Sequence, residues 1–484
     1  MMLEAIAEGW GVALTDEQTD EIVDRLVVEM THIEGIRIVL QHLGDVERQA
    51  LAFVAVQGQV RSHVMTRKYG GIRRLGPGRL EWQKAWRDPV SPVEHLWFLG
   101  LLHREYGVDS VYHGEVFFVP PDLQGALPPM EVALPAFRVE HVRKPPTARD
   151  DRDALARDVF AMLAHLRKNS VRAKRGVLAK HEFARLRPRL AGSEQPQRMR
   201  FLHHICEEAG LIFRGDGVWR PTDEAAGWLK DGALARRRAL YHTWLEDRNW
   251  NDLCMVPEVV CEATGWRGDP VLARRGILDH LLKCPADAWL RVTSLVDSIH
   301  DVDPDFMRPD GDYESWYIRD ARTGHYLMGY DNWDKVEGAL IRYFVEYPLY
   351  WLGVVAIGYL QGEDGASCFR LTDSCAATVG LHELDEAPVQ QMIVQSNLRV
   401  IVPLTASWYD RYLLERFARW EGEEHGTARY VIDDASVRAC LDRGVSINQI
   451  LAFLRRATGD TVPAGALRSI ESWGQVEGRP GQRL

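Results

Sequence analysis

The hydrophobic and polar positions of the chain switch between helical and strand-like spacing in a recurring order. Near its middle, apolar residues at helical spacing predict helices over residues 153–168, 178–190 and 199–210. The segment LIFRGDGVWRP follows, in which a Gly-Asp-Gly turn joins two apolar strands into a hairpin. Three helices followed by a two-stranded hairpin is the element order of a winged-helix domain, so we predict one here.

A similar order is found on both sides of this segment. Toward the N-terminus, three predicted helices between residues 44 and 107 precede a strand-like segment around Val116 and Val119. Toward the C-terminus, an aromatic-rich stretch ends in SCFRLTDSCAATVG, a third strand followed by a turn and a helix start. The sequence therefore predicts a helix-rich α+β fold, with winged-helix-like domains over residues 1–140, 141–235 and 236–385 and a small α/β domain over residues 386–484.

The last hundred residues follow an acidic segment that ends in Pro388, a composition typical of a linker between domains. The strand-like pieces QMIVQ and LRVIVPL flank a Ser-Asn turn, which predicts a hairpin. The tail is large enough to bury a core of its own, so we expect residues 386–484 to be a separable unit.

Specific positions of this tail match a known pattern. They are the hairpin residues Val394, Gln395, Asn397, Val400 and Val402, the helix Leu413–Trp420, and Tyr430, Ile432, Gly444, Ile450, Leu451, Phe453, Leu454, Pro463 and Trp473. The tail thereby resembles the helicase-associated domain at the N-terminus of XPB-type helicases. More loosely, the preceding 385 residues resemble bacterial proteins that carry winged-helix segments ahead of such a domain. The resemblance implies a role at distorted or opening DNA, in repair, transcription or defence.

The charge of the chain is distributed unevenly. Its net charge of −10 argues by itself against a nucleic-acid partner. However, residues 167–200 carry a net charge of +9 and residues 61–87 carry +7, which leaves −26 for the remainder. Such asymmetry is typical of a surface that binds nucleic acid. The alternative is a solvated helix face in a chain that has 50 Arg and 9 Lys.

From these two clusters we predict a DNA-binding site. Its residues are Arg61, Arg67, Lys68, Arg73, Arg74, Arg167, Lys168, Arg172, Lys174, Arg175, Lys180, Arg185, Arg187 and Arg189. Residues 178–190 are expected to form the recognition helix, flanked by basic residues that neutralise phosphates. In the tail, Arg399, Arg411, Arg416 and Arg419 are expected to be exposed.

The chemistry of an enzyme is missing from the sequence. No Gly-Lys dipeptide occurs, so the phosphate-binding loop of a helicase motor is absent, and H-E-x-x-H, G-x-S-x-G and Rossmann glycine motifs are absent too. The seven cysteines form no C-x-x-C pair, and His203, His204 and Cys206 point apart on a helix, so we expect neither metal nor cofactor. The acidic run between Asp301 and Asp312 is expected to be a solvated loop.

The most plausible class is therefore a non-catalytic DNA-binding accessory protein. Its expected partners are duplex or forked DNA and a helicase or nuclease, in the cytoplasm and associated with the nucleoid. No stretch of 18 apolar residues occurs, so no membrane partner is expected. Two alternatives remain at this point: a protein–protein scaffold that does not bind DNA, and an enzyme whose site uses unfamiliar parts.

Overall fold

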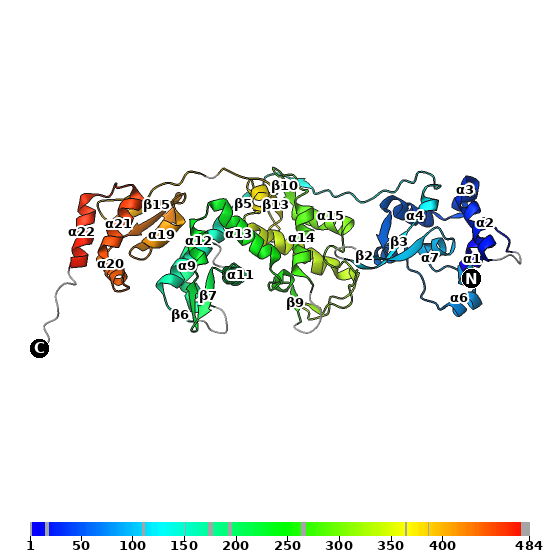
Figure 1. Ribbon diagram of the computed structural model, residues 1–484, viewed down its shortest axis with the longest axis horizontal. Coiled ribbons are helices and arrows are strands. Elements are labelled where there is room, and N and C mark those ends of the chain that lie inside the picture. Colours follow the sequence, from blue (N-terminus) through cyan, green and yellow to red (C-terminus); the bar gives the residue numbers. More distant parts are fainter. Residues whose placement is uncertain are drawn as a thin grey trace.

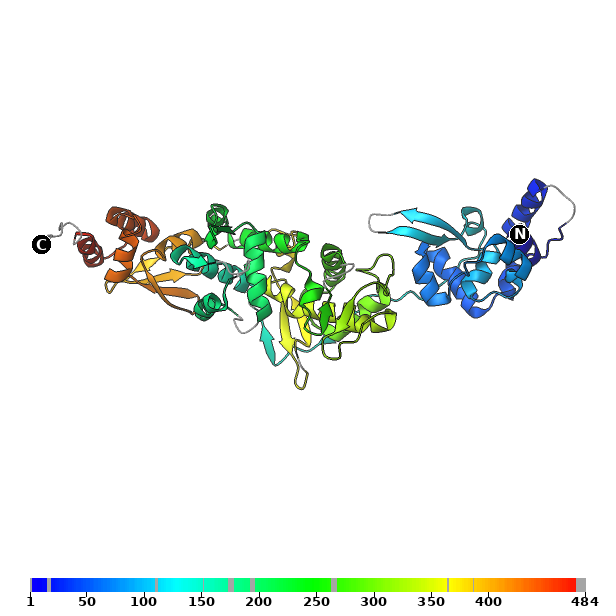
Figure 2. The same ribbon diagram turned by 90° about the horizontal axis from the view of Figure 1, so that it is seen from below.

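The computed structural model describes residues 2–14, 19–108, 112–150, 152–172, 178–191, 196–262, 268–363, 365–385 and 387–475. Helices predominate, and the strands of the described residues form small antiparallel sheets of two to five strands. The parts lie in a row along an elongated molecule, with the first and last helices at opposite ends; residues 252–378 lie next to the N-terminal part, and residues 154–246 lie next to the tail (Figures 1 and 2). In the described ranges, no helix has the length and apolar character needed to cross a membrane.

The N-terminal unit, residues 2–124, packs its helices around a three-stranded sheet with the order β1-β3-β2. Its elements are α1 (Met2–Gly9), α2 (Thr19–Thr31), α3 (Ile33–His42), α4 (Asp45–Gln57), β1 (Gln59–Arg61), α5 (Ser62–Tyr69), α6 (Pro77–Gln83), α7 (Pro92–Phe98), β2 (His103–Val108), β3 (His113–Phe118) and α8 (Pro121–Gln124). Leu51, Leu96 and Phe117 meet in its core, so α4, α7 and β3 are held together by apolar contacts.

The second unit, residues 154–246, has a smaller sheet with the order β6-β8-β7. Its elements are α9 (Ala154–Lys168), β6 (Val171–Arg172), α10 (Lys180–Leu186), the 3-10 turn η2 (Arg187–Arg189), α11 (Pro196–Glu208), β7 (Ile212–Gly215), β8 (Val218–Pro221), α12 (Glu224–Lys230) and α13 (Ala233–Glu246). The predicted Gly-Asp-Gly turn is present between β7 and β8, with Asp216 and Gly217 both at positive φ.

The third unit, residues 252–378, contains a five-stranded sheet with the order β4-β10-β13-β12-β5. Its elements are β9 (Val259–Cys261), α14 (Pro270–Leu281), β10 (Trp289–Arg291), α15 (Val292–Val302), β11 (Ile318–Asp320), α16 (Ala339–Glu346), α17 (Pro348–Trp351), β12 (Val355–Tyr359), β13 (Cys368–Leu371) and α18 (Cys375–Thr378). The two edge strands, β4 (His141–Val142) and β5 (Thr147–Arg149), come from the segment ahead of the second unit. Residues 141–149 therefore pair with the third unit, although the sequence pattern assigned them to the second predicted domain.

One order of elements occurs three times: helix, strand, at least two helices, then a hairpin whose second strand pairs with the first strand; the first unit has α6 inserted among these helices and the third has β11 and α17. The second and third units nevertheless share one continuous core, because Phe201 on α11 packs against Trp250 and Trp351. The predicted division at residue 235 thus crosses a buried interface. The reason is that aromatic side chains of the third unit complete the core of the second.

The tail, residues 393–475, has a four-stranded sheet with the order β14-β15-β17-β16 and a core of its own. Its elements are β14 (Ile393–Val394), β15 (Arg399–Pro403), α19 (Trp408–Leu414), β16 (Arg419–Glu424), β17 (Thr427–Val431), α20 (Asp434–Leu441), α21 (Ile447–Thr458) and α22 (Ala464–Gln475). The hairpin predicted around the Ser-Asn turn is confirmed. The helix expected over Leu413–Trp420 is wrong, because α19 ends at Leu414 and Trp420 lies in β16 opposite Tyr430.

Candidate nucleic-acid interface

The predicted basic residues of the N-terminal unit are mostly engaged within the protein. Arg73 forms an ion pair with the buried Glu94 at 2.8 Å, and Lys68 lies over the ring of Phe53 at 4.4 Å. Arg61 lies over Tyr112 and also reaches the carbonyl of Pro309 in the third unit. Arg74 is exposed. This cluster therefore contributes little free positive charge to a surface.

Arg67 has a structural role between units. Both of its Nη atoms donate to Asp305, at 2.9 and 2.7 Å, and His63 and Tyr313 contact the same carboxylate at 3.2 and 2.8 Å. Burial alone would raise the pKa of Asp305, but hydrogen bonds from His63 and Arg67 hold it well below its usual range. Asp305 is 6% exposed, so the prediction of a solvated acidic loop is wrong at this position. Its carboxylate joins α5 to the third unit.

The predicted basic residues of the second unit occupy three different environments. Lys174 and Arg175 lie outside the described residues, as does the side chain of Lys180. Arg172, Arg185 and Arg187 are exposed, although Arg185 pairs with Glu182 at 3.1 Å. Arg189 instead forms a buried ion pair with Glu415 of the tail, with 2.8 Å between Nη1 and Oε2. Arg189 therefore joins two parts of the molecule and is not available to a phosphate.

Arg167 and Lys168, at the C-terminal end of α9, face the tail. The guanidinium of Arg167 lies 4.3 Å from the ring centroid of Tyr412. Tyr412 and Trp408, both on α19, are buried in the core of the second and third units. We call this contact between α9, η2 and α19 the seam. It shows that the tail, despite its own core, is packed against the rest of the chain.

The helix expected to enter a DNA groove is not placed for that task. Residues 178–190 form α10 and η2, whereas the helix directly ahead of the hairpin is α11. Phe201, Leu202 and Ile205 of α11 are at most 1% exposed. In the corresponding helices α7 and α16, every residue is described and none is exposed. Among the described side chains of α11, the exposed ones are Arg200, Glu207 and Glu208, so its free face carries more negative than positive charge, which disfavours contact with DNA.

The second-unit sheet, β6-β8-β7, offers an accessible surface. Arg172, Phe213 and Arg220 lie on its outer face, because Phe213 is opposite Arg220 and Trp219 on the other face is buried. Arg214, on the edge strand β7, is also exposed, but it is opposite Trp219 and therefore points to the other side of the sheet. Arg220 has a carboxylate, Asp216, only at 3.9 Å between two exposed groups, an interaction worth less than about 1 kcal/mol. Figure 1 shows β6 and β7 at the lower edge of the molecule, away from the central core.

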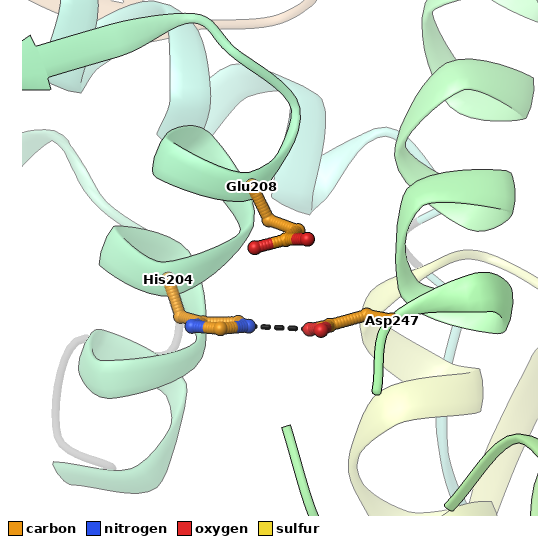
Figure 3. Close-up of side chains that lie close together, drawn as sticks. All are labelled: His204, Glu208 and Asp247. Carbon is orange, nitrogen blue, oxygen red and sulfur yellow. Dashed lines mark hydrogen bonds and ion pairs between the residues drawn. The ribbon is translucent and has the colours of Figure 1, made fainter. Parts of the chain in front are cut away.

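A second arrangement could hold a metal ion. His204 and Glu208 lie one turn apart on α11, Asp247 follows α13, and their ligand atoms are all within 4.8 Å of one another (Figure 3). The Asp247 carboxylate pairs with His204 and accepts the backbone N–H of Asn249 at 2.7 Å. Hydrogen bonding within the protein thus already satisfies Asp247. The i, i+4 spacing of His204 and Glu208 was visible in the sequence, but their convergence with Asp247 depends on the fold.

No protein-family model matches this chain, and no curated protein sequence matches it either. The sequence located the basic second unit, but it missed Arg214 and Arg220 because they lie outside the densest run of charge. For Arg220 the available signal was strand alternation, which places it on the face opposite to the apolar Trp219.

Proposed function

We propose that this chain is a non-catalytic DNA-binding accessory protein that holds the phosphate backbone with the second-unit sheet. The observation that carries the proposal is the pair of exposed Arg172 and Arg220 on one face of the sheet, beside the half-exposed Phe213, with Arg214 exposed on the edge strand of the same sheet. Arginine pairs well with phosphate because its planar guanidinium can donate two parallel hydrogen bonds. The threefold element order supports assignment of the units as winged helices, and the resemblance of the tail supports work beside a helicase or nuclease.

The proposed mode of DNA binding follows from which elements are exposed to solvent. No described residue of helices α7 and α16 is exposed, and the exposed residues of α11 include Glu207 and Glu208, so contacts to phosphates from strands are favoured over reading of bases by these helices. Such binding is electrostatic and depends little on sequence. The negative remainder of the chain disfavours an extended footprint, because like charge elsewhere repels the duplex.

The experiment is a fluorescence anisotropy titration of a labelled duplex with the full chain. Reversing Arg172, Arg214 and Arg220 to Glu should reduce affinity at least about tenfold, or about 1.4 kcal/mol. The matched control reverses Arg322, Arg455 and Arg468, three exposed arginines elsewhere, with the same change of net charge. Equal affinity of the two triple variants would refute the proposed surface.

A second candidate function is a protein–protein scaffold. It is favoured by apolar side chains on α2 and α3 that face solvent: Val28 is 66% exposed, Ile33 72% and Ile38 54%. A cluster of exposed apolar residues often marks a binding surface for another protein. The titration separates the two candidates, because a scaffold that does not bind DNA shows no affinity for the duplex in any variant.

A further inference from the structure

The seam contains a cluster of cations that the proposed interface does not use. Arg167, Lys168, Arg416 and Arg443 line a small cavity of about 100 Å³ together with Tyr412 and Glu415. Arg167 and Lys168 end α9, Arg416 follows α19, and Arg443 follows α20. Two of these cations therefore come from the second unit and two from the tail.

The cations of the cavity lack counter-charges. Within the described ranges, none of the four forms an ion pair, and the Nη1 atom of Arg167 is buried without a hydrogen-bond partner. Glu415, the acid of the cavity wall, is already paired with Arg189 and accepts a hydrogen bond from Tyr430 at 2.8 Å. A buried guanidinium with an unmade hydrogen bond is costly, which favours an anion at this position.

The guanidinium groups act on one another and on a common neighbour. Burial and the charge of Arg416 lower the pKa of Arg167. Burial raises the pKa of the Cys440 thiol, and Arg416, Arg443 and Arg167 all oppose that rise. The same three guanidiniums line the cavity, so their charges lie near one another. Repulsion of this kind is relieved when an anion binds between the groups.

The partial negative charges at helix C-termini offset only part of the positive charge of the four cations. The C-terminal ends of α9, α19 and α20 each contribute a partial charge of at most about −0.5, or roughly −1.5 together. The four formal positive charges of the cations exceed this partial negative charge. A cavity volume of about 100 Å³ is enough for a compact oxyanion.

We infer that Arg167, Lys168, Arg416 and Arg443 form a binding site for a phosphate group. This inference rests on the proposed function. If the chain binds DNA, the phosphate at this site is the terminal phosphate of a DNA strand. A terminal phosphate carries a charge of about −1.5 to −2 at pH 7, more than the single charge of a backbone phosphate, and it presents three acceptor oxygens. The site bridges the second unit and the tail, so its occupation strengthens the seam.

The first test measures binding of inorganic phosphate and pyrophosphate to the full chain by titration calorimetry. The double variant R416A/R443A should lose at least about tenfold in affinity, because two charge-assisted hydrogen-bonding groups are removed. The control R455A/R468A removes two exposed arginines of the same tail and should bind like the wild type. Circular dichroism melting without ligand checks that the variants fold, and R416Q or R443Q alone replaces the double variant if it does not.

The second test compares 5′-phosphorylated, 3′-phosphorylated and unphosphorylated oligonucleotides. Tighter binding of a phosphorylated end, lost in R416A/R443A, supports a DNA end as the source, whereas phosphate binding without such a preference supports a free phosphate. Phosphate binding in a chain that binds no DNA would keep the site and refute the proposed function. Equal phosphate affinity of the wild type and R416A/R443A, or no phosphate binding by either, would overturn the inference.

Discussion

Replacement of Arg189 by Ala should destabilise the protein, although sequence analysis assigned this residue to DNA. The side chains of Arg189 and Glu415 are 17% and 9% exposed, and Tyr430 donates to the same carboxylate at 2.8 Å. Removing one partner leaves a buried charge without compensation, which typically costs about 3–5 kcal/mol. At roughly 2–4 °C per kcal/mol for a cooperative unit of 150–250 residues, the melting temperature should fall by about 6–20 °C.

The assay is thermal melting followed by circular dichroism at neutral pH. The control is R429A, which removes one partner of the exposed Arg429–Glu424 pair in the same tail and should change stability by less than about 1 kcal/mol. Burial alone would raise the pKa of Glu415, but Arg189 holds it below its usual value, so the pair stabilises at neutral pH and is lost on acidification. Similar melting temperatures of R189A and R429A would refute this account of the seam.

Three further predictions concern other parts of the molecule. The pKa of Asp305 is depressed, so the stability that its ion pair contributes is full above the ordinary pKa of 3.8 and is lost as pH falls below it. Small-angle scattering should therefore show the N-terminal unit separating from the third unit in acid, and already at pH 7 in R67A. Unchanged scattering would argue against this contact. The full chain should purify without stoichiometric metal, because Asp247 is satisfied by hydrogen bonds; one metal per chain by mass spectrometry, abolished in E208A, would contradict this. Gly353 has φ +72°, and a Cβ atom added there would lie 2.6 Å from a backbone carbonyl oxygen, so G353A should lower the melting temperature, in contrast to G227A, whose Cβ meets nothing within 4 Å.

Local features of the fold were predictable from the sequence because their causes are local. The Gly-Asp-Gly and Ser-Asn turns each produced the expected hairpin. Asp433 caps α20 by accepting the backbone N–H of Ser436 at 2.9 Å, as is typical of Asp at a helix start. These features depend on backbone conformation and side-chain hydrogen bonds over a few residues.

Long-range features were not predictable from the pattern of charge. Arg67 and Arg189 look like surface cations in the sequence, but their partners are Asp305 and Glu415, more than two hundred residues away. A basic run in the sequence does not show whether an arginine contacts phosphate or forms an ion pair between units. Both roles need an arginine whose guanidinium reaches beyond its own unit, and the partner is decided only by how the units pack together. The burial of α11 was hidden for the same reason, since the third unit supplies the covering aromatic side chains.

The central claim, that the second-unit sheet binds the phosphate backbone, is tested most directly by the salt dependence of duplex affinity. If Arg172, Arg214 and Arg220 each neutralise one phosphate, the logarithm of the association constant should fall against the logarithm of salt concentration with a slope of about −3. Reversing the three residues to Glu should bring the slope close to zero, while the control triple variant keeps the wild-type slope. A wild-type chain that does not bind duplex, or that keeps its slope after the reversal, would contradict the claim.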